Sequence, residues 1–179
     1  MSRTRPVAAL AAALILACPA DLPADIDHRP AILSDWRDAE SIPALVSVLD
    51  DWLDAQSIWP RRATAPRIRL VTPWQAAARQ GETASFQRGS LRGAYDPDRS
   101  EILLVRPWSA DKPQDVSVLL HELVHHRQAP HHWYCPAAQE LPAYRLQEDW
   151  LEANGRAADV NWVAVVLDAG CTPRDIHPD

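Results

Sequence analysis

The sequence contains no cluster of basic residues, and Lys112 is its single lysine. Its 18 basic side chains are outnumbered by 24 acidic ones, which gives a formal net charge of −6 at pH 7. A protein that binds nucleic acid needs concentrated positive charge to neutralise phosphate groups, and this chain has none. The charge balance therefore argues against nucleic acid as the main partner.

Cysteine and long apolar runs are also scarce. The chain has three cysteines, Cys18, Cys135 and Cys171, and no two of them have the C-x-x-C spacing of a zinc motif. A zinc site built from cysteines is therefore not expected. The apolar run over residues 7–17 is too short to form a stable transmembrane anchor.

The N-terminal region is typical of a secretory signal peptide. Two arginines precede the apolar run and small residues follow it, so we expect residues 1–20 to be a signal peptide cleaved after Ala20. The alternative is lipoprotein processing at Cys18, because residues 15–18 resemble a lipobox. Both routes predict an exported protein, periplasmic or secreted, or an outer-membrane lipoprotein. A lipid anchor at Cys18 would be its only membrane contact.

Export changes the interpretation of the other two cysteines. Cys135 and Cys171 form an even pair in an oxidising compartment, so we predict a disulfide between them. The alternative is a pair of buried thiols.

The rest of the composition is that of an ordinary globular protein, with 47% hydrophobic and 23% charged residues. A length of 179 residues suits one domain with a substantial core. Residues 21–40 contain prolines and aspartates without clear periodicity, and we expect them to form an N-terminal arm. Residues 41–179 are expected to form the domain.

Local patterns predict a mixture of helices and short strands. Helices are expected where apolar residues recur at helical spacing, and strands where polar and apolar residues alternate. The strands predicted at 91–95 and 101–105 flank an Asp/Pro turn and should form a hairpin. Trp52, Trp150 and Trp162 fall in apolar helical patterns and are expected in the core. Further predicted elements are helices at about 41–57, 74–80, 113–128, 137–153 and 157–169, and a strand at 67–72.

The helix predicted over residues 113–128 carries the motif H-E-x-x-H at His121, Glu122 and His125. Residues four apart on a helix lie on one face, so both imidazoles can reach a single metal ion. Glu122 directly follows the first histidine. Its carboxylate is therefore expected beside the open coordination position, where it can deprotonate a zinc-bound water. The sequence thus predicts a catalytic Zn²⁺ site.

A catalytic zinc ion usually has three protein ligands, and two residues could provide the third. His131 stands at the last position of the metzincin pattern H-E-x-x-H-x-x-G-x-x-H. However, Gln128 occupies the glycine position of that pattern, and Met1 is the only methionine available for its Met-turn. Glu140 lies on the next predicted helix, which carries Tyr144 on the same face. Glu140 is therefore the second candidate beside His131.

An H-E-x-x-H helix followed by a glutamate on a second helix resembles the gluzincin group of zinc metallopeptidases. The resemblance covers about residues 91–153. It implies a minimal zincin-like domain in which His121, His125 and Glu140 bind zinc and Glu122 is the general base. With this resemblance Glu140 is the preferred third ligand, and His131 is the alternative.

The resemblance has two further implications. In gluzincins the strand nearest the active-site helix pairs with an extended substrate, and residues 101–105 are the strand expected to do so here. The segments 120–126 and 140–147 also resemble small exported bacterial proteins of uncharacterised function.

We therefore expect an α+β protein with a small sheet, the motif helix and a helical C-terminal part. Its expected function is that of an exported zinc-dependent metallohydrolase, preferentially a metallopeptidase acting on peptides or proteins. Tyr144 is the residue expected to stabilise the developing oxyanion, with His132 and Tyr134 as alternatives. Two other functions remain open: hydrolysis of a cell-wall or other non-protein amide bond, and zinc binding without catalysis.

Overall fold

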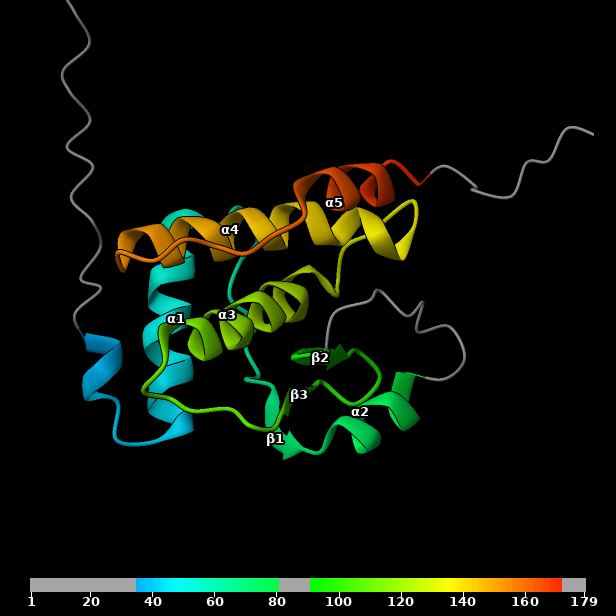
Figure 1. Cartoon of the computed structure of the whole chain (residues 1–179). Coiled ribbons are helices and arrows are strands. Elements are labelled where there is room, and N and C mark those ends of the chain that lie inside the picture. The colour runs from blue at the N-terminus through cyan, green and yellow to red at the C-terminus, as the bar shows by residue number, and fades with distance from the viewer. Residues whose placement is uncertain (1–34, 81–90, 172–179) are drawn as a thin grey trace, which may run out of the picture.

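The computed structural model describes residues 35–80 and 91–171, which form an α+β fold with a three-stranded sheet (Figure 1). The predicted signal peptide, with Cys18, lies outside the described residues. None of the described helices is long and apolar enough to cross a membrane. In chain order the elements are η1 (Asp35–Asp38), α1 (Ile42–Gln56), β1 (Arg67–Val71), α2 (Pro73–Gln80), β2 (Gly93–Asp96), β3 (Glu101–Val105), α3 (Pro113–Gln128), η3 (Pro136–Gln139), α4 (Glu140–Ala153) and α5 (Trp162–Ala169).

The sheet has the strand order β1-β3-β2, with β3 in the centre. β2 and β3 form the predicted antiparallel hairpin, in which Tyr95 lies opposite Ile102. β1 runs parallel to β3, and Val71 lies opposite Val105. All five residues of β3 are buried, since neighbouring strands occupy both of its edges and helices cover both faces.

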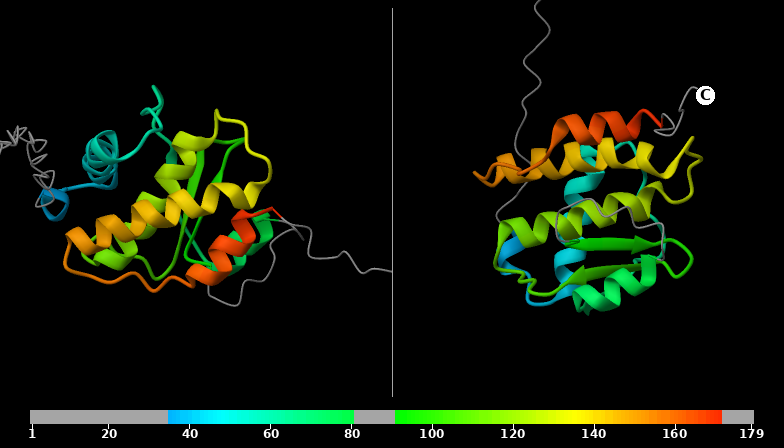
Figure 2. Two further views of the ribbon diagram at one scale, coloured as in Figure 1. Left: turned by 90° about the horizontal axis from the view of Figure 1, so that it is seen from above. Right: turned by 45° about the vertical axis from the view of Figure 1, so that its right-hand side comes forward.

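Helices α3 and α2 lie on opposite faces of the sheet, as the right-hand view of Figure 2 shows. Ile102 and Leu104 belong to the main core together with the apolar side chains of α3. Leu103 and Val105 point to the other face and pack with Ala76 of α2. The alternation of side chains along β3 therefore divides the apolar interior into two parts.

α1 and α4 pack against α3, so that α3 is enclosed by the sheet and two helices (Figure 1). Ser41 caps α1, and its hydroxyl accepts a hydrogen bond from the Ala44 backbone N–H at 3.3 Å. Trp52 and Trp150 are buried, which confirms their predicted place in the core.

The predicted N-terminal arm is wrong for its last part. Trp36, in η1, is 2% exposed, and its ring centroid lies 5.5 Å from that of Trp150. Its indole N–H donates to Asn154 Oδ1 at 2.7 Å. A single tryptophan can anchor a segment that shows no periodicity, because it buries a large apolar area. The packed domain therefore includes η1, and residues 21–34 lie outside the described part of the chain.

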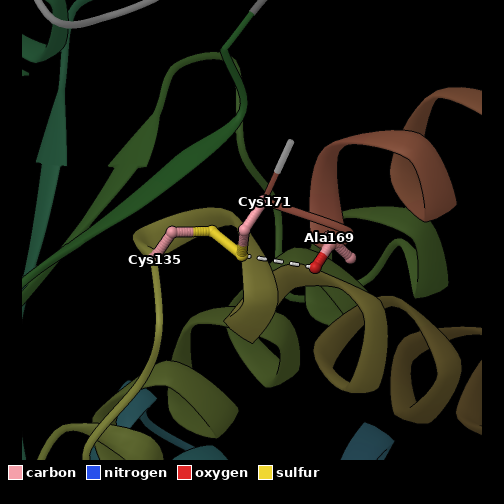
Figure 3. The surroundings of a disulfide bond; sticks show 3 residues. All are labelled: Cys135, Ala169 and Cys171. Carbon is pink, nitrogen blue, oxygen red and sulfur yellow. Dashed lines mark hydrogen bonds between the residues drawn. A yellow bond between two sulfur atoms is a disulfide. The ribbon is translucent and has the colours of Figure 1, made fainter. Parts of the chain in front are cut away.

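α5 lies on the outer side of the domain, against α4 and η3. It begins at Trp162 rather than near residue 157, and none of its residues is fully buried. Trp162 is predicted to lie in the core, but it is only half-buried. Its indole N–H donates to Glu148 Oε1 at 3.1 Å on the surface of α4. The predicted disulfide joins Cys135 to Cys171 and attaches the end of α5 to the segment just before η3 (Figure 3).

Candidate metal centre

α3 is enclosed along most of its length, and thirteen of its sixteen residues are buried. Its apolar residues, including Leu119, Leu120 and Leu123, are fully buried in the main core. Its C-terminal half also buries five polar side chains, those of His121, Glu122, His126, Arg127 and Gln128. Polar groups are costly to bury without partners, so this half of the helix is organised for more than packing.

Three side chains converge between α3 and the first turn of α4. The Nε2 atoms of His121 and His125 are 3.0 Å apart. Glu140, the first residue of α4, approaches both imidazoles: its Oε2 lies 3.3 Å from His121 Nε2, and its Oε1 lies 3.4 Å from His125 Nε2. The structure therefore brings together the three residues that sequence analysis selects as metal ligands.

The donor atoms and their spacing fit a zinc ion. Four ligands at about 2.0–2.1 Å in a tetrahedral arrangement place neighbouring donor atoms ~3.3 Å apart. The three distances here are 3.0, 3.3 and 3.4 Å. Two imidazoles and a carboxylate are also a donor set found in catalytic zinc sites, where the fourth position stays open.

Gln128 orients one of the histidines. Its Oε1 lies 2.9 Å from His125 Nδ1, and its own Nε2 donates to the Gln139 backbone carbonyl at 3.3 Å. Because a carboxamide oxygen can only accept, Nδ1 of His125 must carry a proton, and Nε2 is the nitrogen that can release its proton and bind a metal. Gln128 is fully buried. The residue at the metzincin glycine position thus supports the metal centre from the same helix.

His131, the alternative third ligand, lies outside this group. Its side chain is exposed, and its backbone N–H donates to the Gln128 carbonyl in the turn that ends α3. Among the described residues, the group that could hold a metal ion consists of His121, His125 and Glu140. Because α3 ends at Gln128, His131 lies beyond the helix that carries the other two histidines.

Glu122 lies against strand β2 and is 6% exposed. A Cβ atom added to Gly93 would lie 2.7 Å from Glu122 Oε1, so the carboxylate occupies the space that a side chain would need. The backbone of Tyr95 lies close to the same carboxylate and acts to lower its pKa slightly. Burial raises the pKa of Glu122 above its ordinary value, and the neighbouring imidazoles of His121 and His125 oppose this only in part. A raised pKa suits a general base that works near neutral pH.

Sequence reasoning misses Gly93 and Gln128. Gln128 has a weak signal, because it follows His125 by three positions on one helix and therefore lies close to it. Gly93 has none, since its contact with Glu122 depends on how β2 is placed against α3.

The aromatic ring of Tyr144 packs edge-on against His121, with ring centroids 4.5 Å apart. Burial raises the pKa of Tyr144, and the negative charges of Glu140 and Glu122 act in the same direction. The phenol therefore stays protonated at neutral pH and is able to donate a hydrogen bond. His132 is exposed and Tyr134 is 96% exposed, so neither alternative shares this position.

His125 and Glu140 form a charged pair when no metal is bound. Burial alone would lower the pKa of His125, but the hydrogen bond and charge of Glu140 outweigh it and raise this pKa from 6.5 to about 9. For Glu140, burial favours the neutral acid, yet the hydrogen bonds from His121 and His125 lower its pKa well below the usual range. Glu140 is therefore a carboxylate at neutral pH, which is the form that binds a metal ion.

Residues 101–105 have no free edge for a substrate, contrary to the expectation drawn from the resemblance. Residues 101–105 form β3, which already has a neighbouring strand along each edge. Within the described residues, β2 has a strand on one side only, and it is β2 that contacts Glu122 through Gly93. The prediction failed because the sequence patterns of β2 and β3 are similar in strength and do not show which of the two strands lies at the edge of the sheet.

The chain belongs to a family described as a domain of unknown function (DUF6647), whose profile matches residues 38–179. The match begins within η1 and covers all the elements that surround the metal centre. No curated protein and no solved structure matches the sequence. The family description thus defines the extent of the domain, and its chemistry has to be inferred from the site.

Proposed function

We propose that the protein is an exported, zinc-dependent metallohydrolase that acts as a metallopeptidase. The observation that carries this proposal is the convergence of His121, His125 and Glu140 beside the buried carboxylate of Glu122. A structural zinc site normally has four protein ligands and needs no base beside them. Three ligand side chains with a neighbouring carboxylate favour hydrolysis over a structural role.

The residues of the site divide the chemistry between them. A zinc ion held by His121, His125 and Glu140 would supply a Lewis acid that polarises a carbonyl group and acidifies water. Glu122 takes a proton from the attacking water and passes it to the leaving amine, for which its raised pKa is suited. Tyr144, which stays protonated, donates a hydrogen bond to the developing oxyanion.

One structural feature favours a peptide substrate, and another favours an exported protein. The outer edge of β2 lies next to Glu122, and an extended peptide can add to a strand edge through main-chain hydrogen bonds. The disulfide between Cys135 and Cys171 is typical of proteins in oxidising compartments. The proposal therefore unites the sheet edge, the metal centre and the predicted export signal.

Metal content and turnover, measured on matched variants, test the proposal. We expect about one zinc ion per wild-type chain by elemental analysis, and loss of that zinc in His121→Ala and Glu140→Ala. His131→Ala is the control, because it removes an exposed histidine outside the group, and it should keep the metal. Glu122→Gln should keep zinc but lose hydrolysis of a library of internally quenched peptides, with bacterial cell-wall sacculi as a second substrate.

Each outcome has a distinct meaning. A folded wild type that binds no zinc after reconstitution would overturn the proposal, and full peptide hydrolysis by Glu122→Gln would overturn the role of the base. Zinc lost from His131→Ala but kept in Glu140→Ala would move the third ligand to His131. Cleavage of sacculi without any cleavage of peptides would replace the metallopeptidase by a cell-wall amide hydrolase.

A further inference from the structure

A second polar cluster lies next to the metal centre, on the face of α3 that meets β2. It consists of His126, Tyr95, Arg62 and the carbonyl group of Thr64. His126 follows the ligand His125 directly, yet it points to a different side of the helix and is 3% exposed. The proposed chemistry does not use this buried histidine.

The hydrogen bonds of the cluster define the role of each group. His126 Nε2 lies 2.9 Å from the Thr64 carbonyl oxygen, which can only accept, so Nε2 carries the proton. His126 Nδ1 is then an acceptor, 3.1 Å from the Tyr95 hydroxyl and 3.2 Å from Arg62 Nη1. Arg62 Nη1 also donates to the Tyr95 hydroxyl at 3.0 Å. The phenol of Tyr95 is thus fixed by one acceptor and one donor, and its ring packs edge-on against His126.

The backbone of Tyr95 faces the general base. The Val105 N–H donates to the Arg92 carbonyl at 2.9 Å, so these two residues form a hydrogen-bonded pair between β2 and β3. Such pairs alternate along antiparallel strands, and the backbone groups of Gly93 and Tyr95 therefore point away from β3. Glu122 lies against Gly93 on the face of β2 that meets α3, and the backbone of Tyr95 is close enough to its carboxylate to influence it.

Tyr95 consequently contacts two residues one helical turn apart. Glu122 and His126 are separated by four positions and share one face of α3. The main chain of Tyr95 meets Glu122, whereas its side chain meets His126. A displacement of the phenol would therefore move the backbone that supports the Glu122 carboxylate.

We propose that Tyr95, fixed through its phenol by His126 and Arg62, is a positioning residue that sets the place of the Glu122 carboxylate. The role rests on the proposed function, because Glu122 matters as a base only if the protein is a hydrolase. The phenol bonds to His126 and Arg62 rather than to a metal-binding side chain. The effect of Tyr95 is therefore on turnover and not on metal binding.

Tyr95→Phe removes the hydroxyl group and keeps the ring. We expect it to retain one zinc ion and an unchanged KM for a cleaved peptide, while kcat falls by about 10- to 100-fold, as small misplacements of catalytic groups do. Tyr134→Phe makes the same chemical change at a side chain that is 96% exposed, and it should match the wild type. Arg62→Met removes the donor to the phenol and should act in the same direction with a smaller effect.

Amide hydrogen exchange by NMR provides a readout that does not depend on activity. In Tyr95→Phe, the amide of residue 95 should exchange at least about tenfold faster than in the wild type, because it loses its place against Glu122, while amides of β3 keep their protection. Unchanged exchange at residue 95 would overturn the positioning role, whatever the wild type hydrolyses. Equal acceleration throughout β3 would also overturn it, since the phenol would then support the whole fold.

The two proposals can fail separately. A wild type without zinc or without hydrolysis would contradict the proposed function, and the exchange measurement would still decide whether the phenol controls the backbone beside Glu122. A wild type that hydrolyses peptides, together with a Tyr95→Phe variant of unchanged kcat, would leave the hydrolase intact and reject Tyr95 as a positioning residue.

Discussion

At the scale of single residues, the hydrogen bond between Gln128 and His125 links packing to metal chemistry. Its length is 2.9 Å, and it fixes the imidazole so that Nε2 faces His121 and Glu140. Groups that hold a ligand in this way are buried together with it, and loss of one typically weakens metal binding by 10- to 100-fold.

We therefore expect Gln128→Leu to weaken zinc binding by about 10- to 100-fold, because His125 loses the acceptor that fixes its ring. Competition with a chelator of known affinity would measure the change. Gln128→Glu keeps an acceptor at the same position and serves as the control, and it should retain most of the affinity. Equal affinities for the wild type and Gln128→Leu would show that packing alone orients His125.

At the scale of elements, a buried ion pair attaches α3 to α1. Arg127 is 1% exposed, and its Nη2 atom lies 2.7 Å from Asp50 Oδ1 and 2.8 Å from Asp54 Oδ1. It also donates to the backbone carbonyls of Asp50 and Trp59. The helix that carries the metal ligands is thereby fixed to α1 two residues after His125.

Arg127→Met should lower the free energy of unfolding by about 3–5 kcal/mol, because Asp50 would be left buried without its counter-charge. Urea unfolding followed by circular dichroism would measure this loss. Arg99→Met is the matched control: Arg99 pairs with Asp96 on the surface, where solvent screens the charges, and its loss should change stability far less. Similar losses in both variants would show that the buried pair contributes no more than a surface pair.

Elements with a strong local pattern could be predicted from the sequence. The stripe of Leu119, Leu120 and Leu123 predicts α3 with its observed bounds, and alternation around an Asp/Pro turn predicts the β2–β3 hairpin. The fold class and the pairing of Cys135 with Cys171 also follow from composition and context. His121 and His125 could be selected because H-E-x-x-H spacing defines a geometry on any helix, whereas Glu140 is selected through the resemblance to gluzincins.

Contacts between distant segments could not be predicted in this way. The parallel pairing of β1 with β3 leaves no signal in either strand, so the central place of residues 101–105 went undetected. Trp36 lies in a stretch without periodicity, and its partner Trp150 is remote in the chain. Gly93 and Tyr95 gain their importance from α3, which follows them in sequence.

At the scale of the whole molecule, the metal-free protein should depend on pH in a way that the zinc-bound protein does not. The pKa of His125 is raised from 6.5 to about 9 in the folded chain. Burial lowers this pKa, but the hydrogen bond and the charge of Glu140 together raise it by more. A group whose pKa is higher in the folded state stabilises the fold below the unfolded value, and this contribution disappears as the pH rises through the folded value.

We therefore expect the melting temperature of the metal-free protein to fall between pH 6.5 and about 9. Glu140 adds the opposite dependence in acid: its pKa is lowered in the folded chain, so its contribution is present above the ordinary value of 4.5 and is lost below it. With zinc bound, His125 is deprotonated throughout this alkaline range, and the fall should be absent. Calorimetry of chelator-treated and zinc-loaded protein across the range provides the measurement, and identical profiles would contradict the expectation.

The disulfide also has a consequence for how the protein is made. Cys171 lies downstream of every helix and strand that the structure describes, and its partner Cys135 precedes Glu140 by five residues. A chain synthesised from its N-terminus therefore cannot close this bond until α4 and α5 have both been made. A truncated product that ends before Cys171 would still contain His121, His125 and Glu140, but α5 would no longer be tied to η3. The bond thus marks a chain that has been made at least as far as Cys171.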